Sequence, residues 1–252
     1  MSTASALRFQ LERTLERPFP SALTPKTRTG YEIAPCGIPA VDELLDGGLP
    51  VGEISEISGT ETSGRTSLAL SFLALRTGDG QACAWVDVND TLDPESAAAN
   101  GVSLRQLLWV RCRDAEKTAD RKPWTRLDQA LKAVDLILQA AGFAAVVLDL
   151  GSTAPEHASR IPLATWFRFR QGAQRSRTSL LVLGRMPYAQ SSAAVVLECE
   201  NLKEPGSAGV MRGLRFDVRR QRQRFPQTQP GGRKPPASTW SAGGSWDATR
   251  RA

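Results

Sequence analysis

One nine-residue stretch, GTETSGRTS from Gly59 to Ser67, constrains the fold of this chain more than any other part of it. It fits the phosphate-binding pattern G-x-x-x-x-G-K-[ST] at both glycines and at Thr66, whereas Arg65 stands where that pattern has lysine. The apolar run EISEIS precedes the stretch, and the helical pattern TSLALSFLALRTG follows it. Backbone N–H groups of such a loop surround phosphates, and the next helix adds its positive end. The sequence therefore predicts a strand–loop–helix unit that binds an anion.

The residues of this stretch that could contact a nucleotide are Gly59, Ser63, Gly64, Arg65, Thr66 and Ser67. In such loops the Ser/Thr hydroxyl holds Mg²⁺, which is the role expected for Thr66. A second acid ends a neighbouring apolar strand, and AAVVLDL supplies Asp149 for the same metal. Arg65 keeps the positive charge of lysine but is planar and bulkier, so the exchange is not conservative. We therefore expect ATP and Mg²⁺ to bind weakly at most, and we assign no catalytic residue.

Strand and helix patterns alternate from Ile54 onward, which predicts an α/β fold with a mostly parallel sheet flanked by helices. Apolar runs without alternation indicate strands buried on both faces, and they lie at 82–88, 106–112, 144–150, 178–184 and 193–199. Residues 213–222 are expected to form a final edge strand. The 252 residues suffice for one domain with tails. We expect an N-terminal helix and linker at 1–30, a core at 31–222, and a disordered basic tail at 223–252.

The positive charge is concentrated at the C-terminus. Residues 219–252 hold eight Lys/Arg and one acid, a net +7, whereas the whole chain is +6, so residues 1–218 sum to −1. Basic tails rich in Pro, Gly and Gln often bind nucleic acid, although a solvated tail without a partner is the other interpretation. The single histidine excludes a His-cluster metal site. The absence of a signal pattern and of a long apolar run indicates a cytoplasmic protein.

Two runs of the sequence resemble a known family. The run GIPAVDELLDGGLPVGEISEISGTETSGRTSLALSF resembles the opening of the RecA recombinase core, and CAWVDVNDTLDPESAAANGV continues the match. The similarity keeps its order through Asp149 to about Arg222, roughly 190 of 252 residues. It implies a RecA-like P-loop core, with ATP and Mg²⁺ as ligands and DNA as partner. Asp93, Thr66 and Asp149 match nucleotide-binding positions of that family.

Four functional positions of the RecA pattern are altered in this chain: Arg65, Asn89, Ser96 and Arg185. By the resemblance, Asn89 stands where RecA-type enzymes carry the glutamate that orients the attacking water. Ser96 stands where a tyrosine stacks on adenine, and Arg185 lies near the place of a glutamine that senses the γ-phosphate. An amide cannot act as a general base, so the resemblance implies a weakened or vestigial ATPase.

The altered site, together with GRTSLAL, CAWVD, LLWVRC and IPLATWFRFR, is similar to ImuA-type proteins. These RecA relatives are implied to act in SOS-induced translesion synthesis, beside the Y-family polymerase relative ImuB and an alternative replicative-type DNA polymerase. A cytoplasmic, nucleoid-associated location follows from that role. Two alternatives remain open: a DNA-dependent ATPase that modulates RecA filaments, and an interaction protein related to cell-division inhibitors.

Candidate contact surfaces follow from charge and aromatic content. Arginine beside aromatics suits single-stranded nucleic acid, and the candidate DNA-binding residues are Arg168, Arg170, Arg175, Arg177, Arg219, Arg220, Arg222 and Arg224. The other interpretation of WFRFRQGAQRSR is an amphipathic helix with aromatics in the core. Apolar anchors for a partner are expected at Leu7, Leu11, Leu15, Trp240 and Trp246.

Overall fold

A sheet of eight strands carries the fold, in the order β10-β9-β8-β3-β7-β6-β4-β5. In the computed structural model the described residues are 32–113, 125–202, 214–224 and 237–242. The strands are β3 (Ile54–Gly59), β4 (Cys83–Asp87), β5 (Leu107–Arg111), β6 (Ala145–Asp149), β7 (Ser179–Gly184), β8 (Ala193–Leu202), β9 (Leu214–Gln223) and β10 (Ala237–Ala242). Every pairing from β8 to β5 is parallel, whereas β9 and β10 join antiparallel. The predicted α/β class with a mostly parallel sheet is confirmed.

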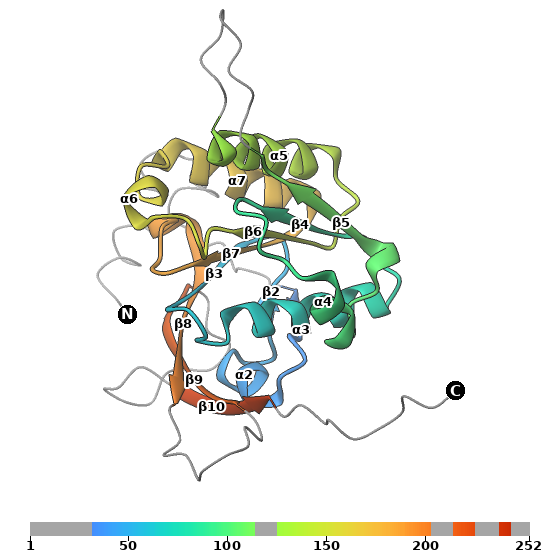
Figure 1. Cartoon of the computed structure of the whole chain (residues 1–252), viewed down its shortest axis with the longest axis vertical. Coiled ribbons are helices and arrows are strands. Elements are labelled where there is room, and N and C mark those ends of the chain that lie inside the picture. The colour runs from blue at the N-terminus through green and yellow to red at the C-terminus, as the bar shows by residue number, and fades with distance from the viewer. Residues whose placement is uncertain (1–31, 114–124, 203–213, 225–236, 243–252) are drawn as a thin grey trace, which may run out of the picture. The chain divides into compact units, whose positions relative to one another are not determined.

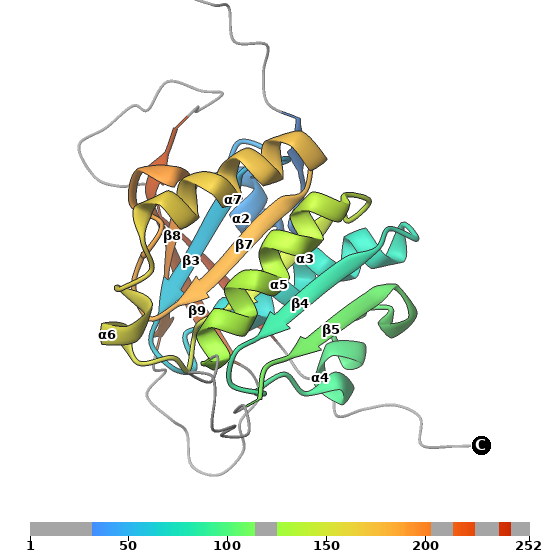
Figure 2. The ribbon, with the colours of Figure 1, turned by 90° about the horizontal axis from the view of Figure 1, so that it is seen from above.

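Helices cover both faces of this sheet (Figures 1 and 2). They are α2 (Pro39–Leu44), α3 (Arg65–Gly78), α4 (Pro94–Ala99), α5 (Arg126–Ala140), α6 (Pro155–Ala158) and α7 (Leu163–Ser176). Single turns lie at Leu104–Gln106 and Gln190–Ser192, and a separate small sheet pairs β1 (Ile33–Ala34) with β2 (Leu49–Pro50). Helix α5 begins at a capping box formed by Thr125 and Asp128.

Two apolar clusters, one on each face, explain why the strand sequences do not alternate. In β6, Ala145 and Val147 pack into the cluster that contains α2 and α3. Their neighbours Val146 and Leu148 pack into the cluster that contains α5 and α7. Successive side chains of a strand point to opposite faces, so both sets must be apolar when both faces are covered.

The C-terminal segment differs from expectation. Strand β9 is not an edge strand, because β10 pairs along its outer side. Strand β10 lies within the segment expected to be disordered, and its Trp240 packs on Phe216 of β9 with 4.6 Å between ring centroids. Trp240, expected as an anchor for a partner, is thus partly buried within the protein itself. The Trp240 ring supplies apolar area to the strand, although the composition of the surrounding segment predicts disorder.

Some expectations fall on residues outside the described part of the chain. These include the N-terminal helix at 1–30 with Leu7, Leu11 and Leu15, and also Trp246. Within the described part, no helix has the length and apolar character that a membrane span requires.

Candidate nucleotide site

The predicted strand–loop–helix unit is confirmed between β3 and α3. Strand β3 ends at Gly59 and helix α3 begins at Arg65, directly after Gly64. Gly64 has φ 88°, in the left-handed region where a side chain is strained. A Cβ on Gly64 would also lie 2.7 Å from the ring of Phe216, so the loop backbone rests on that ring. Glycine is therefore required at this position by backbone conformation and by packing.

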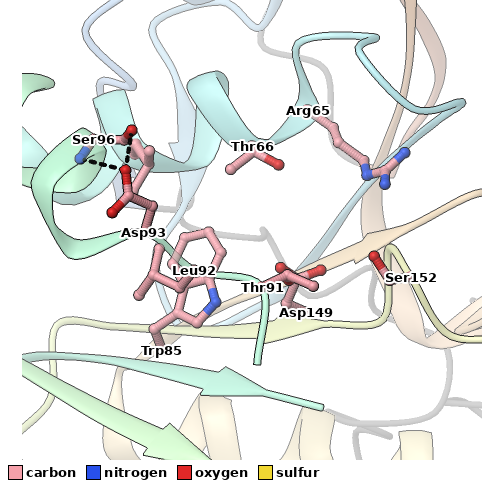
Figure 3. A pocket seen from close by; sticks show the side chains of 10 residues that line it. Arg65, Thr66, Trp85, Thr91, Leu92, Asp93, Ser96, Asp149 and Ser152 are labelled. Atoms are coloured by element: carbon pink, nitrogen blue, oxygen red, sulfur yellow. Dashed lines mark hydrogen bonds between the residues drawn. The ribbon is translucent and has the colours of Figure 1, made fainter. Parts of the chain in front are cut away.

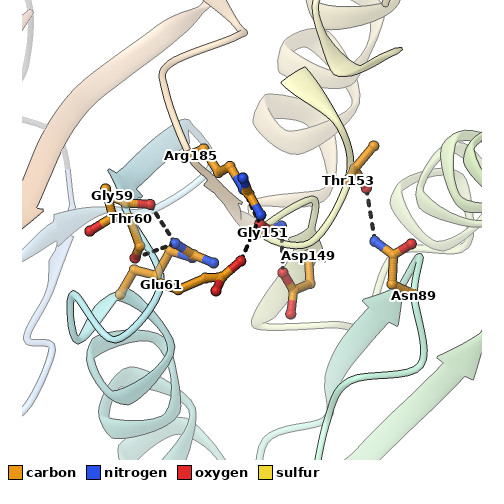
Figure 4. A network of polar contacts seen from close by, with 9 residues as sticks. Gly59, Thr60, Glu61, Asn89, Asp149, Gly151, Thr153 and Arg185 are labelled. Atoms are coloured by element: carbon orange, nitrogen blue, oxygen red, sulfur yellow. Dashed lines mark hydrogen bonds and ion pairs between the residues drawn. The ribbon is translucent and has the colours of Figure 1, made fainter. Parts of the chain in front are cut away.

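The side chain of Arg65 turns back into the loop. It is 8% exposed, and its guanidinium donates to the carbonyl oxygens of Gly59 and, at 2.6 Å, of Thr60 (Figure 4). On its other side lies Gly151, where an added Cβ would be 2.6 Å from Nη2 of Arg65. The guanidinium is thus held between the loop and the residues that follow β6.

A cavity of about 300 Å³ lies beside the loop (Figure 3). Thr66, Asp93 and Asp149 all line it, so the structure brings these predicted residues together. Hydroxyls of Thr91 and Ser152 also line it, and the sequence analysis missed them. Both residues follow carboxyl ends of parallel strands, where α/β folds place their ligand sites, and that position was the available signal.

The carboxyl group of Asp149 is buried beside a second acid. The pKa of Asp149 is raised to about 6, mainly by burial and in part by the charge of Asp87, its register partner on β4. The N–H of Gly151 donates to Oδ1 at 2.9 Å and opposes the shift, as does the charge of Arg65. A carboxylate in this place would gain from a bound cation.

We expect stability to depend on the protonation of Asp149. Its folded-state pKa lies above the ordinary 3.8, so the folded protein binds the proton more tightly than the unfolded chain does. The resulting stabilisation is complete below about pH 4 and is lost as pH rises through 6, amounting to about 3 kcal/mol at most. Asp149→Asn should therefore be more stable than wild type at pH 7.5, and the difference should shrink toward pH 4. Urea unfolding at several pH values measures it.

The matched control for that experiment is Asp79→Asn, which changes an exposed acid at the end of α3. The difference in unfolding free energy between Asp149→Asn and wild type should change more between pH 4 and 7.5 than the difference between this control and wild type. A constant difference between Asp149→Asn and wild type over the same range would contradict the assignment of the proton to Asp149.

Each of the other altered positions is engaged within the protein. Asn89 Nδ2 donates to Thr153 Oγ1 at 3.0 Å, and Arg185 pairs with Glu61 at 2.6 Å (Figure 4). The hydroxyl of Ser96 donates at 2.5 Å to Asp93, whose carboxylate also caps the first amides of α4 (Figure 3). Each of these three side chains therefore has a polar partner within the protein.

The side chains around the cavity fit one part of a nucleotide ligand. Thr66 and the buried Asp149 fit a Mg²⁺ ion with a phosphate. Ser63 of the loop has a buried Oγ without a hydrogen-bond partner among the described residues, but it is not one of the residues that line the cavity. Asn89 contributes an amide, not a carboxylate, at its position after β4.

The arginines of α7 fall into two groups. Arg170 lies 3.5 Å from the buried Glu53, and Arg177 pairs with Glu32. Arg168 pairs with Asp135 at 3.0 Å but remains half-exposed, and Arg175 is exposed. Trp166 and Phe169 are fully buried, as the amphipathic-helix interpretation expects, whereas Phe167 is 54% exposed. Within α7, the outer face therefore places arginine beside the exposed ring of Phe167.

The arginines of β9, and Arg224 directly after it, have partners within the chain. Arg219 pairs with Asp217 and Glu200, and Arg220 donates to the carbonyl of Leu44 at 2.6 Å. Arg222 donates to the carbonyl oxygen of Gln190, and Arg224 donates to that of Ala193 at 3.3 Å. DNA binding by these four residues stays a prediction, because contact with phosphate would compete with these bonds.

The fold and the glycine loop together define a P-loop protein with a RecA-like sheet. Residues 10–155 match the RecA N-terminal domain, and the chain belongs to that family. It is 35% identical over 140 residues to Protein RecA of Nostoc punctiforme, covering 56% of this chain and 36% of the relative. It is 30% identical over 209 residues to Protein RecA of Symbiobacterium thermophilum, covering 82% and 52%. The chain thus spans about a third to a half of these relatives.

Solved structures show the same fold at low sequence identity. A RadB recombinase superposes with a TM-score of 0.56 at 18% identity, covering 83% of this chain and 94% of that one. A KaiC-like protein of Pyrococcus horikoshii gives a TM-score of 0.56 at 15% identity, covering 79% and 91%. The described structure is therefore an α/β RecA-like fold.

Proposed function

We propose that this member of the RecA family is an ImuA-type accessory protein of SOS-induced, error-prone translesion DNA synthesis. In this role it binds DNA and an ImuB-like relative of the Y-family polymerases. An alternative replicative-type DNA polymerase, and RecA itself, are the further partners of this proposal. The place of action is the cytoplasm, at the nucleoid.

One observation carries the proposal: side chains at the altered family positions form hydrogen bonds within the protein. Asn89 bonds to Thr153, Ser96 to Asp93, and Arg65 to the carbonyls of its own loop. A RecA core with these contacts retains a rigid sheet but lacks the group that drives a hydrolytic cycle. Its function in this proposal is to bind DNA and a partner protein.

The alternative of a DNA-dependent ATPase that modulates RecA filaments is favoured by a different observation. Thr66 and Asp149 line one cavity, as a Mg²⁺-bound nucleotide would require. When bound, Mg²⁺ would neutralise phosphate charge. In the accessory-protein proposal this cavity takes a nucleotide weakly, without turning it over.

The discriminating experiment is co-purification of the tagged full chain from DNA-damaged cells, with the partners identified by mass spectrometry. Recovery of a Y-family polymerase relative supports the accessory role. Recovery of RecA alone favours the alternative, and recovery of division proteins without DNA-replication proteins contradicts the proposal.

Two sets of variants should locate the partner contact. We expect Leu7→Ala with Leu11→Ala, or Trp246→Ala, to weaken capture of the ImuB-like partner at least tenfold, because loss of a good apolar anchor costs about 2 kcal/mol or more. A pull-down titration measures the effect, and circular dichroism melts check folding. Wild-type capture by both variants would move the contact onto the RecA-like core.

A further inference from the structure

The phosphate-binding loop rests on an aromatic side chain from the far end of the chain. Phe216 of β9 is 2% exposed, and its ring lies where a Cβ on Gly64 would be, at 2.7 Å. Gly64 is the last residue before α3, so its position sets where the helix and the loop amides begin. Movement of the Phe216 ring therefore changes the support of the whole loop.

Phe216 is in turn held by β10. Trp240 is its register partner on that strand, and the two rings lie 4.6 Å apart with 37° between their planes. Strand β10 also packs beside α2 (Figure 1). The neighbours of Trp240 on the strand, Thr239 and Ser241, are exposed.

A single large side chain thus fixes this edge strand. The sequence of β10 is ASTWSA, in which Trp240 is the one large apolar residue. Tryptophan burial contributes far more than that of alanine, serine or threonine, because stabilisation scales with apolar area removed from water. The indole Nε1 of Trp240 is buried without a hydrogen-bond partner among the described residues. An unpaired buried donor costs free energy and lowers the barrier to releasing the ring.

We propose that β10 controls the phosphate-binding loop. With Trp240 seated, Phe216 is pressed beneath Gly64 and the loop is held in its present form. With Trp240 withdrawn, Phe216 loses its backing and the loop amides become mobile.

This coupling gives the C-terminal segment a regulatory role. The kind of partner that engages it is a protein with an apolar pocket for an indole ring. Such a partner cannot bind Trp240 while that ring packs on Phe216, so partner capture and a supported loop exclude each other. Only the identity of that partner rests on the proposed function; the coupling itself belongs to the isolated chain.

Hydrogen–deuterium exchange of the full-length protein tests the coupling without any partner. The readout is the exchange of loop amides from residues 59–67, compared among wild type, Trp240→Ala, Trp240→Phe and the matched control Thr239→Ala. We expect Trp240→Ala to speed loop exchange about tenfold, as for a local opening made easier. Thr239→Ala should match wild type, because its side chain faces solvent, and Trp240→Phe should fall between them.

A second variant removes the ring that lies between the strand and the loop. Phe216→Leu keeps an apolar side chain but removes the ring under Gly64 and beside Trp240, so it should speed exchange of both the loop and β10. Faster exchange of β10 in Trp240→Ala with an unchanged loop would overturn the proposal. An equal rise in β6 and α5 would also overturn it, because it would mean general loss of stability. Failure to capture an ImuB-like partner would leave both exchange results standing and would count against the proposed function alone.

Discussion

Mg·ATP should remain unhydrolysed in the presence of this protein, with or without single-stranded DNA. By the family resemblance, the position of Asn89 belongs to a glutamate that orients the attacking water. In this structure the Asn89 amide donates to Thr153 and offers no base. Loss of a general base typically costs about 10² to 10⁴ in rate. A phosphate-release assay measures hydrolysis of ATP, and calorimetry measures its binding.

The companion variants sharpen that assay. Arg65→Lys restores the family residue of the loop but leaves Asn89 unchanged, so it should remain without turnover. Thr66→Ala removes the hydroxyl beside Asp149 and serves as the control for a contaminating enzyme. Turnover above about 1 s⁻¹, ordinary for an enzyme, that disappears in Thr66→Ala would show a working ATPase and contradict the expectation.

Binding to single-stranded DNA should be salt-sensitive, and the basic residues that follow Arg224 should carry most of it. These are Arg233, Lys234, Arg250 and Arg251. Each neutralised phosphate contributes about −0.7 to the log–log salt slope on single strands. Replacing all four with glutamine should flatten the slope by up to about 3 and lower affinity at least tenfold at low salt. Fluorescence anisotropy over a salt series measures both quantities.

The matched variant for this experiment is Arg168→Gln with Arg175→Gln, on the outer face of α7. Removing the whole C-terminal part from residue 217 onward would be a poor test, because it would also delete β10 and most of β9. If the four-residue variant keeps the wild-type slope while the α7 variant loses it, the DNA contact lies on α7 beside Phe167.

The main elements of the fold could be predicted because their signals are local. Gly59 and Gly64 marked the loop by spacing, and the apolar run ending at Asp149 marked a strand covered on both faces. Strand β10 could not be found in this way, since ASTWSA has one large apolar residue and is flanked by prolines and glycines. Its stability comes from Phe216, whose ring was not known to be its neighbour until the sheet was assembled.

In the candidate site, too, residues within local motifs could be predicted, whereas contacts between distant segments could not. Thr66 and Asp149 were assigned from motif and strand end, and they line one cavity. The bond from Asn89 to Thr153 spans 64 positions in the sequence, and the ion pair of Arg170 with the buried Glu53 also joins distant segments. Such contacts decide whether an arginine is free for a ligand, and no spacing rule predicts them.

The strand order has a consequence for how this protein is made. Strand β3, which delivers the glycine loop, lies between β7 and β8 and pairs with neither β4 nor β6. During synthesis the loop residues therefore leave the ribosome long before both neighbours of β3 exist. Pairing of β3 with β7 and β8 joins residues more than a hundred positions apart, and such distant pairings form slowly. In the nascent chain the glycine loop consequently lacks both strand neighbours of β3 until β8 has emerged. The ring under Gly64 is added only when Phe216 has been synthesised.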